Sequence, residues 1–368
     1  MHDFMPYCLR QFNRSSRWND DNQYSNLSAA SRSILDFTPP AGFTFYVSKA
    51  PSSFFKSSYR LQTFPLFSGS LGYLFTSEEL DLRRTYCGNQ EPATEDAASS
   101  TAAGTASNST PAFAGSPSST NYLLCGQVFL PTNRIEALYS RRFTRRTQFL
   151  AASAQHRDPA NNELLAQLQY DCSKWCTELS YTFPGSLVGW RGLYNFGPVP
   201  ENPTLEDQRA HPGRVSIGGE LYFSTADNNG GLSVGARYRT LVPQTAEFTC
   251  VTNPVMGHLS TAYTMSITPR CIMSSRFDFN FYSLFSDLAA GIEWQSSEES
   301  LIKASVNTSQ GVVLGFDCRY RKILLSVGAT LSHDSFKRGR RDGRMPADLS
   351  MPHGSPLKSL GIHVQFFS

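Results

Sequence analysis

The sequence has few charged residues and no long apolar run. Charged residues make up 17% of its 368 residues, whereas soluble domains usually carry about 25%. A helix that crosses a bilayer needs about 20 successive apolar residues, but the longest apolar runs here are 311–316 and 324–331. A helical membrane protein is therefore excluded. A transmembrane β-barrel is not, because only alternate residues of its strands meet lipid.

Signals for secretion, nucleic-acid binding and a disulfide scaffold are also missing. The N-terminus begins MHDF, without a basic region followed by an apolar core, so we expect no secretory signal peptide. The net charge of +3 is too small to predict a nucleic-acid partner. The eight cysteines follow no framework spacing, and we expect them to be reduced thiols.

Motifs for catalysis and metal binding are scarce. The sequence contains no phosphate-binding loop, His-Glu-x-x-His or Cys-x-x-Cys motif, and its seven histidines are scattered. The sequence therefore predicts a protein that is not an enzyme. We expect it to have no catalytic residues, no cofactor and no metal site.

The end of the chain, 357–368, carries a clear strand pattern. Leu360, Ile362, Val364 and Phe366 alternate with small or polar residues, and this period-two alternation is typical of a strand with one apolar face. A strand that ends a chain leaves an open edge unless another strand pairs with it. In a membrane barrel the first strand is the usual partner, so we expect the barrel to close here.

The first part of the chain, 1–40, differs from the rest. Apolar residues at helical spacing predict a helix near the N-terminus, and a second helix is expected over 28–36, before Pro39 and Pro40. This helical segment either packs on a domain or lies inside a barrel lumen. The sequence leaves both arrangements open.

The remainder, 41–368, is predicted to be a single transmembrane β-barrel. Two inserts interrupt it, a low-complexity loop at 89–120 and a basic, Pro/Gly-rich loop at 333–356. The clearest strand covers 214–224, and similar alternation recurs along the chain without intervening helices, which excludes a parallel α/β sheet. The length suits a large antiparallel barrel, with about 10 residues in each strand and about 4 in each turn.

Alternation also places charged residues on one face of several strands. Arg276 and Asp278 stand between the apolar residues Phe277 and Phe279, for example. In a soluble sandwich such charges would face outward, whereas in a membrane barrel they line a wet lumen. The low charge content and the many strands favour the membrane barrel.

Four stretches resemble the fungal mitochondrial distribution and morphology protein 10 family. They are 18–27 (WNDDNQYSNL), 68–75 (SGSLGYLF), 214–222 (RVSIGGELY) and 277–283 (FDFNFYS). The resemblance runs from Trp18 to the C-terminus. It implies a barrel of about 19 strands in the mitochondrial outer membrane, similar in plan to the voltage-dependent anion channel.

The resemblance also implies a function and partners. Members of the family serve in the endoplasmic reticulum–mitochondria encounter structure, a tether that supports phospholipid exchange and mitochondrial shape. They also join the sorting and assembly machinery, which matures outer-membrane barrels including the translocase channel. The implied partners are subunits of the tether, of the sorting and assembly machinery and of the translocase, together with membrane lipids and no nucleic acid.

Two sets of residues are candidate sites. The last strand resembles the sorting signal of mitochondrial outer-membrane barrels at Ser359, Gly361, Val364 and Phe366. Tyr73 and Phe75 lie two apart on one strand face and are candidate contacts with the sorting and assembly machinery, as the resemblance implies. The ordinary alternative for two such aromatic residues is a place in the aromatic belt at the membrane interface.

A non-enzymatic scaffold in the outer membrane is our first hypothesis for the function. The alternative is an anion or metabolite channel, which would need an open, charge-lined lumen. A third reading is a soluble all-β binding protein.

Overall fold

The computed structural model describes most of the chain. It covers residues 4–52, 54–64, 67–78, 121–158, 161–197, 213–226, 228–240, 244–297, 299–309, 311–331 and 357–367. The two predicted inserts, 89–120 and 333–356, lie outside the described residues.

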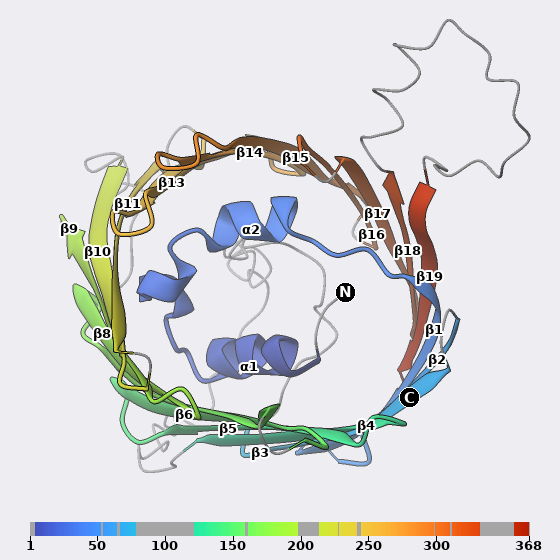
Figure 1. Ribbon diagram of the computed structural model, residues 1–368. Helices are drawn as coiled ribbons and strands as arrows, with labels where there is room; N and C mark the ends of the chain where they lie inside the picture. Colours follow the sequence, from blue (N-terminus) through green and yellow to red (C-terminus); the bar gives the residue numbers. More distant parts are fainter. Residues whose placement is uncertain are drawn as a thin grey trace, which may run out of the picture.

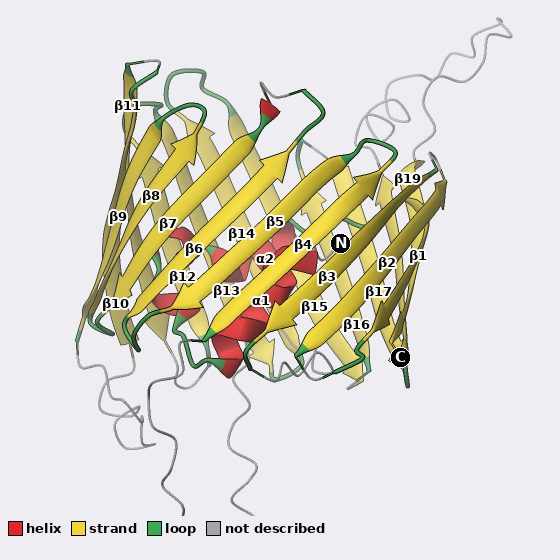
Figure 2. Cartoon of the chain, turned by 90° about the horizontal axis from the view of Figure 1, so that it is seen from below, coloured by secondary structure: helices red, strands yellow, loops and turns green. Residues whose placement is uncertain are grey.

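Within these ranges, nineteen strands form one closed sheet (Figures 1 and 2). The strands are β1 (Gly42–Lys49), β2 (Phe55–Phe64), β3 (Ser68–Thr76), β4 (Tyr122–Leu130), β5 (Arg134–Arg142), β6 (Thr147–Gln155), β7 (Glu163–Asp171), β8 (Trp175–Phe183), β9 (Leu187–Phe196), β10 (Gly213–Ser224), β11 (Asn229–Thr240), β12 (Ala246–Asn253), β13 (His258–Thr268), β14 (Cys271–Asn280), β15 (Ser286–Ser297), β16 (Ser300–Asn307), β17 (Gly311–Tyr320), β18 (Ile323–Leu331) and β19 (Leu357–Phe367). The prediction of an all-β barrel of about 19 strands is confirmed.

The barrel closes between its first and last strands. β1 and β19 pair in parallel, with Gly42 opposite Gly361 and Val47 opposite Phe366. Consecutive strands pair antiparallel, as β1 does with β2 and β18 with β19. Because the number of strands is odd, the first and last strands must run in the same direction. The barrel is therefore antiparallel except at this one pair, which we call the closing pair.

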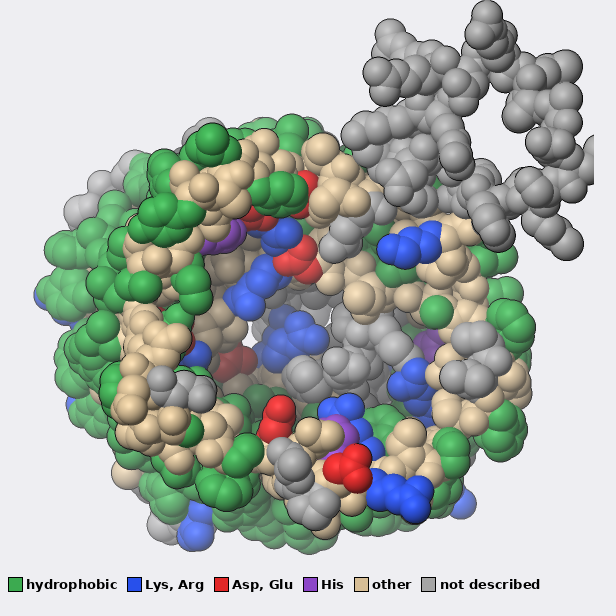
Figure 3. Space-filling view, viewed as in Figure 1, with side chains coloured by type: hydrophobic (Ala, Val, Ile, Leu, Met, Phe, Trp, Pro, Cys, Tyr) green, Lys and Arg blue, Asp and Glu red, His purple; other side chains and the backbone are tan. Residues whose placement is uncertain are grey.

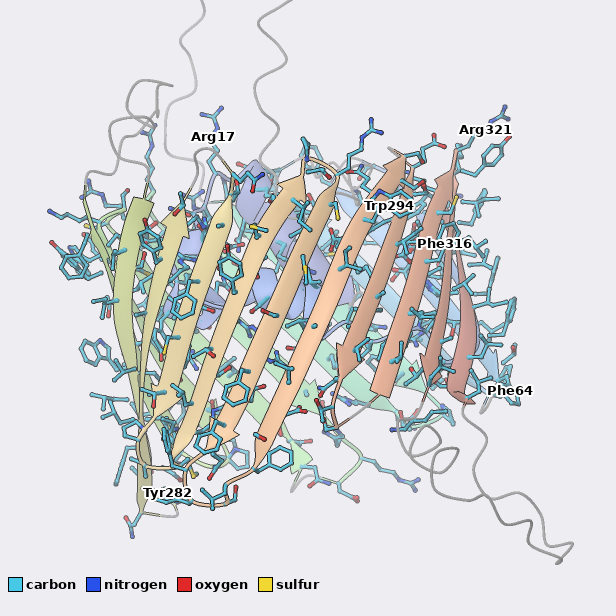
Figure 4. The ribbon with its side chains drawn as sticks, turned by 90° about the horizontal axis from the view of Figure 1, so that it is seen from above. Arg17, Phe64, Tyr282, Trp294, Phe316 and Arg321 are labelled. Carbon is cyan, nitrogen blue, oxygen red and sulfur yellow. The ribbon has the colours of Figure 1, made fainter. Side chains whose placement is uncertain are left out.

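Alternation separates an apolar outer face from a more polar inner face. In β10, Ile217 is 44% exposed on the outer face, whereas the neighbouring Ser216 is 1% exposed on the inner face. Figure 4 shows outer side chains such as Trp294 and Phe316 along the wall. It also shows the two ends of the barrel, which we call the Tyr282 end, where Phe64 also lies, and the Arg321 end, where Arg17 lies. In the described part of the chain, no helix has the length and hydropathy needed to cross a membrane.

The N-terminal residues 4–40, which we call the lumenal segment, lie inside the barrel (Figure 1). The segment contains two α-helices, α1 (Phe4–Ser15) and α2 (Ala29–Leu35), and two short 3-10 helices, η1 (Asp20–Asn22) and η2 (Tyr24–Asn26). Helix α1 contacts β4, η2 contacts β9 and β10, and α2 contacts β13 to β16. The segment therefore follows the inner wall around the barrel before it enters β1.

Candidate functional site

Ion pairs hold the middle of the lumenal segment to the wall. Asp21 accepts a hydrogen bond of 3.2 Å from Arg237, which is 4% exposed, and it also pairs with Arg239. Arg239 reaches Glu247 on β12 at 2.6 Å. Burial raises the pKa of Asp21, but the two arginines outweigh this effect and lower it below its usual value. At neutral pH the Asp21 carboxylate is therefore charged and anchors η1 to β11.

Further hydrogen bonds, some neutral and some charged, attach the residues that follow Asp21 to the wall. Asn22 donates to Asp171 on β7 at 2.5 Å, and the Tyr24 hydroxyl lies 2.8 Å from that of Ser233 on β11. Beyond α2, Arg276 on β14 binds Asp36 through both terminal nitrogens, at 2.6 and 2.8 Å. The segment is thus attached to distant strands by contacts between residues far apart in the sequence.

Helix α1 is held mainly by apolar packing. Cys8 and Phe12, one helical turn apart, are fully buried against Leu74 on β3 and against Leu123 and Cys125 on β4. Burial, reinforced by the neighbouring Cys125, raises the pKa of the Cys8 thiol well above its usual value. The thiol is therefore neutral at physiological pH and behaves as a small apolar side chain.

The end of α1 is fixed at the Arg321 end of the barrel. Arg142 on β5 donates to the Ser16 carbonyl and lies over the Trp18 ring at 5.3 Å from its centroid. Burial raises the pKa of the nearby Asp20 to about 7, although Asn13 donates to it at 2.7 Å. Asp20 is thus partly protonated near neutral pH, unlike its charged neighbour Asp21.

Glycines on the inner face make room for the segment. A methyl group at Gly315 would come within 2.9 Å of the Phe37 ring, and one at Gly361 within 2.6 Å of the Pro40 carbonyl carbon. The same close approach recurs along the segment, and we call these glycines the glycine row: Gly218, Gly235, Gly291, Gly315, Gly328 and Gly361. Each stands where the wall meets Tyr24, Leu27 or a residue from Ile34 to Pro40.

The two aromatic candidates lie on the outer wall. Tyr73 and Phe75 on β3 are 44% and 40% exposed. The Tyr73 ring lies over Gly126 on β4, and the Phe75 ring lies 5.9 Å from that of Tyr122. Both side chains are therefore available to lipid or to a partner. Which of the two they meet stays a prediction.

The four sorting-signal candidates are divided between the faces of β19. Ser359 and Gly361 lie on the inner face with the partly buried His363, whereas Val364 and Phe366 alternate with them toward the outside. Gly361, Val364 and Phe366 pair with both β18 and β1, so they belong to the closing pair. Their role in sorting stays a prediction.

The structure brings the two candidate sets onto one part of the wall. The strands β19, β1, β2 and β3 are consecutive neighbours, so β3 lies three strand spacings from β19, roughly 14 Å across the sheet. The sequence reasoning did not identify the anchors Asp21 and Asp36 or the glycine row. The conspicuous motif at 18–27 and the glycines spaced along the strands were the available signals.

One stretch of the sequence matches the spacing of a catalytic motif. Residues 231–235 read Gly-Leu-Ser-Val-Gly, the spacing of a nucleophile elbow. An elbow requires a sharp strand-to-helix turn, but this stretch lies within β11, and Ser233 is buried beside Tyr24. It is therefore an ordinary strand segment. Among the described residues, no group of three or more metal-ligating side chains could hold a metal ion.

Comparison with known proteins gives a consistent result. A family model described as mitochondrial distribution and morphology protein 10 matches residues 1–300. Proteins of that name are similar to this chain over their full length in Laccaria bicolor, at 30% identity, and in Sclerotinia sclerotiorum, at 31% identity, with 100% of both chains covered in each case. The Yarrowia lipolytica protein of that name is 33% identical, covering 90% of this chain and 95% of its own.

Proposed function

This chain belongs to the mitochondrial distribution and morphology protein 10 family, and from that premise we propose that it is a non-enzymatic scaffold of the mitochondrial outer membrane. It serves mitochondrial distribution and morphology, as the names of its relatives indicate. The barrel anchors the endoplasmic reticulum–mitochondria encounter structure, where phospholipids are exchanged. It also joins the sorting and assembly machinery in late biogenesis of barrels, including the translocase channel.

One observation carries the choice of a scaffold over a channel. The lumenal segment is attached to the wall by the Asp21 and Asp36 ion pairs and by the buried packing of Cys8 and Phe12. An ion channel needs an open, charge-lined path, whereas here three arginines of the inner wall, Arg237, Arg239 and Arg276, are paired with the segment. The outer wall, with its exposed apolar residues, is left for lipid and for protein partners.

Conductance in a planar bilayer tests this choice. A scaffold whose lumen holds its own segment should give no large, reproducible, ion-selective conductance. The double variant Asp21→Asn with Asp36→Asn removes both acidic anchors. Since each charged hydrogen bond contributes about 1.5–3 kcal/mol, it should loosen residues 20–36 from the wall and raise the conductance, although α1 keeps its apolar packing.

The channel hypothesis makes the opposite prediction. The unaltered barrel would conduct as strongly as the double variant, with stable selectivity for anions. That result would count against a scaffold and in favour of a metabolite pathway.

A further inference from the structure

Two cavities meet at the Tyr282 end of the barrel, near the turns that join β2 to β3 and β4 to β5. The first, of about 540 Å³, opens on the inner side of the rim, and we call it the polar cavity. The second, of about 400 Å³, opens on the outer face, and we call it the apolar cavity. Both are lined by Arg60, Gly69, Ser70 and Leu130. The two spaces are therefore neighbours across the edge of the wall.

The apolar cavity depends on a glycine between two leucines. On the outer face, Gly69 on β3 pairs with Leu61 on β2 and with Leu130 on β4. A methyl group at Gly69 would meet only the Arg60 carbonyl oxygen, at 3.4 Å, so the space above it is open. Phe45, Tyr59 and other apolar residues also line it. We call the space above Gly69 the notch; its walls are mostly apolar, and it opens on the outer face like the other outward-facing residues.

The polar cavity is rich in cationic side chains. Arg60, Arg134 and Arg157 line it together with His156, against the single acidic lining residue Asp158. Arg134 also reaches Glu136 at 2.5 Å. Figure 3 shows basic, acidic and histidine side chains gathered at the mouth of the barrel beside β4.

His156 adds a second sign that the polar cavity binds a ligand. Its Nδ1 atom is buried and has no hydrogen-bond partner among the described residues, although its backbone N–H donates to Asn162 at 2.8 Å. Buried polar atoms in folded proteins are almost always paired. An acceptor or donor supplied by a bound group would satisfy this atom.

We propose that the two cavities form one binding site for a glycerophospholipid. The phosphate lies among Arg134, Arg157 and His156, because guanidinium groups bind phosphate oxygens in a bidentate manner. An acyl chain lies in the notch above Gly69. A free phosphate would use only the polar cavity and a simple hydrocarbon only the apolar one, whereas a phospholipid at the rim uses both. The site rests on the proposed placement of the barrel in a membrane and goes beyond the scaffold role.

Native mass spectrometry of the purified full chain in maltoside micelles tests the ligand class. The probe is dioleoylphosphatidylcholine, compared with glycerophosphocholine, which lacks acyl chains, and dioleoylglycerol, which lacks phosphate. We expect one retained phosphatidylcholine, with both partial ligands weaker by about tenfold or more. Equal binding of glycerophosphocholine would reduce the site to a headgroup or phosphate site. Equal binding of dioleoylglycerol would reduce it to ordinary lipid contact, and either result overturns the proposal.

Filling the notch gives a second, independent test. Gly69→Leu should displace the acyl chain and weaken phosphatidylcholine retention about tenfold. Gly192→Leu is the matched control, because Gly192 also faces outward and a methyl group there would have no neighbour nearer than 3.9 Å. Equal retention by the two variants would contradict the proposal.

The headgroup is tested by removing charge. Arg134→Gln with Arg157→Gln should weaken retention by a similar factor, whereas Arg145→Gln with Arg321→Gln, at the other end of the barrel, should not. Lipid binding by the purified barrel needs no partner protein. A barrel that binds the lipid but recovers no partner subunits contradicts the scaffold function alone, and one that recovers partners but fails these tests contradicts this site alone.

Discussion

Cys8 and Cys125 place two buried thiols against each other where helix α1 meets strand β4. Mild oxidation with copper phenanthroline should therefore join them in an intramolecular disulfide, seen as a faster-migrating band on an unreduced gel. Because the thiolate is the reactive form and burial raises the pKa of Cys8, the rate should rise with pH between 7 and 9 without levelling off.

Single substitutions show whether this band reports the position of α1. Cys8→Ser should abolish it, whereas Cys250→Ser, on β12, should leave it unchanged. Persistence of the band in Cys8→Ser would mean that another cysteine pair forms it, and would contradict its assignment to the contact of α1 with β4.

Tyr73 and Phe75 form one outward-facing pair on strand β3. The effect of this pair on partners is therefore a property of the strand and not of a single residue. Both side chains are exposed, and truncating them should cost the fold little. We expect Tyr73→Ala with Phe75→Ala to reduce recovery of sorting and assembly machinery subunits several-fold, while tether subunits are retained.

The same pair of residue types on β9 supplies the control. Tyr194 and Phe196 are also two apart and exposed on the outer wall. Tyr194→Ala with Phe196→Ala should leave recovery of both sets unchanged. An equal loss in the two double variants would assign Tyr73 and Phe75 to the aromatic belt rather than to a partner.

Strand β19 combines the sorting-signal candidates with a structural requirement at Gly361. Because a methyl group there would meet the Pro40 carbonyl carbon at 2.6 Å, Gly361→Ala should weaken the closing pair even without any sorting machinery. We expect a loss of about 1–3 kcal/mol, as for other overpacking substitutions, measured as a lower midpoint for unfolding of the detergent-refolded barrel.

Gly185→Ala, in the turn after β8, is the control for this loss, because nothing lies within 4 Å of a methyl group there. Equal midpoints for Gly361→Ala and Gly185→Ala would show that Pro40 moves aside at no cost. The importance of Gly361 would then lie in sorting alone.

The strands differed in how well their sequences predicted them. Period-two alternation over 214–224 predicted β10 (Gly213–Ser224) almost to the residue. The sequence reasoning did not single out β2 or β5. In β2, Ser57 and Thr63 interrupt the outward apolar residues, and β5 ends in two arginines. Polar residues near the ends of a wall strand weaken the periodic signal without preventing pairing.

The candidate site was predictable only in part. Tyr73 and Phe75 were found through resemblance to a family, whereas the pattern on β19 was found through its period-two alternation and its resemblance to a barrel sorting signal. The glycine row was not predicted, because each glycine is needed for a contact with residues 24–40, which are distant in the sequence. A strand pattern reports which face a residue occupies, but it does not report what lies across the lumen.

Three features of the whole molecule are connected. They are the odd number of strands, the parallel closing pair and the lumenal segment that is bound to the wall. The segment passes through Ala41 into β1, and Pro40 lies next to Gly361 on β19. The lumenal packing and the closure of the barrel therefore meet at one place. Substitutions there should affect both, whereas substitutions on the outer wall should leave both unchanged.

Affinity purification from detergent-solubilised mitochondria tests the scaffold function most directly. The tag is best inserted within 89–120, because α1 lies in the lumen and β19 closes the barrel. A scaffold predicts co-recovery of subunits of both the endoplasmic reticulum–mitochondria tether and the sorting and assembly machinery, well above their recovery with another tagged outer-membrane barrel. Recovery of neither set would contradict the scaffold function.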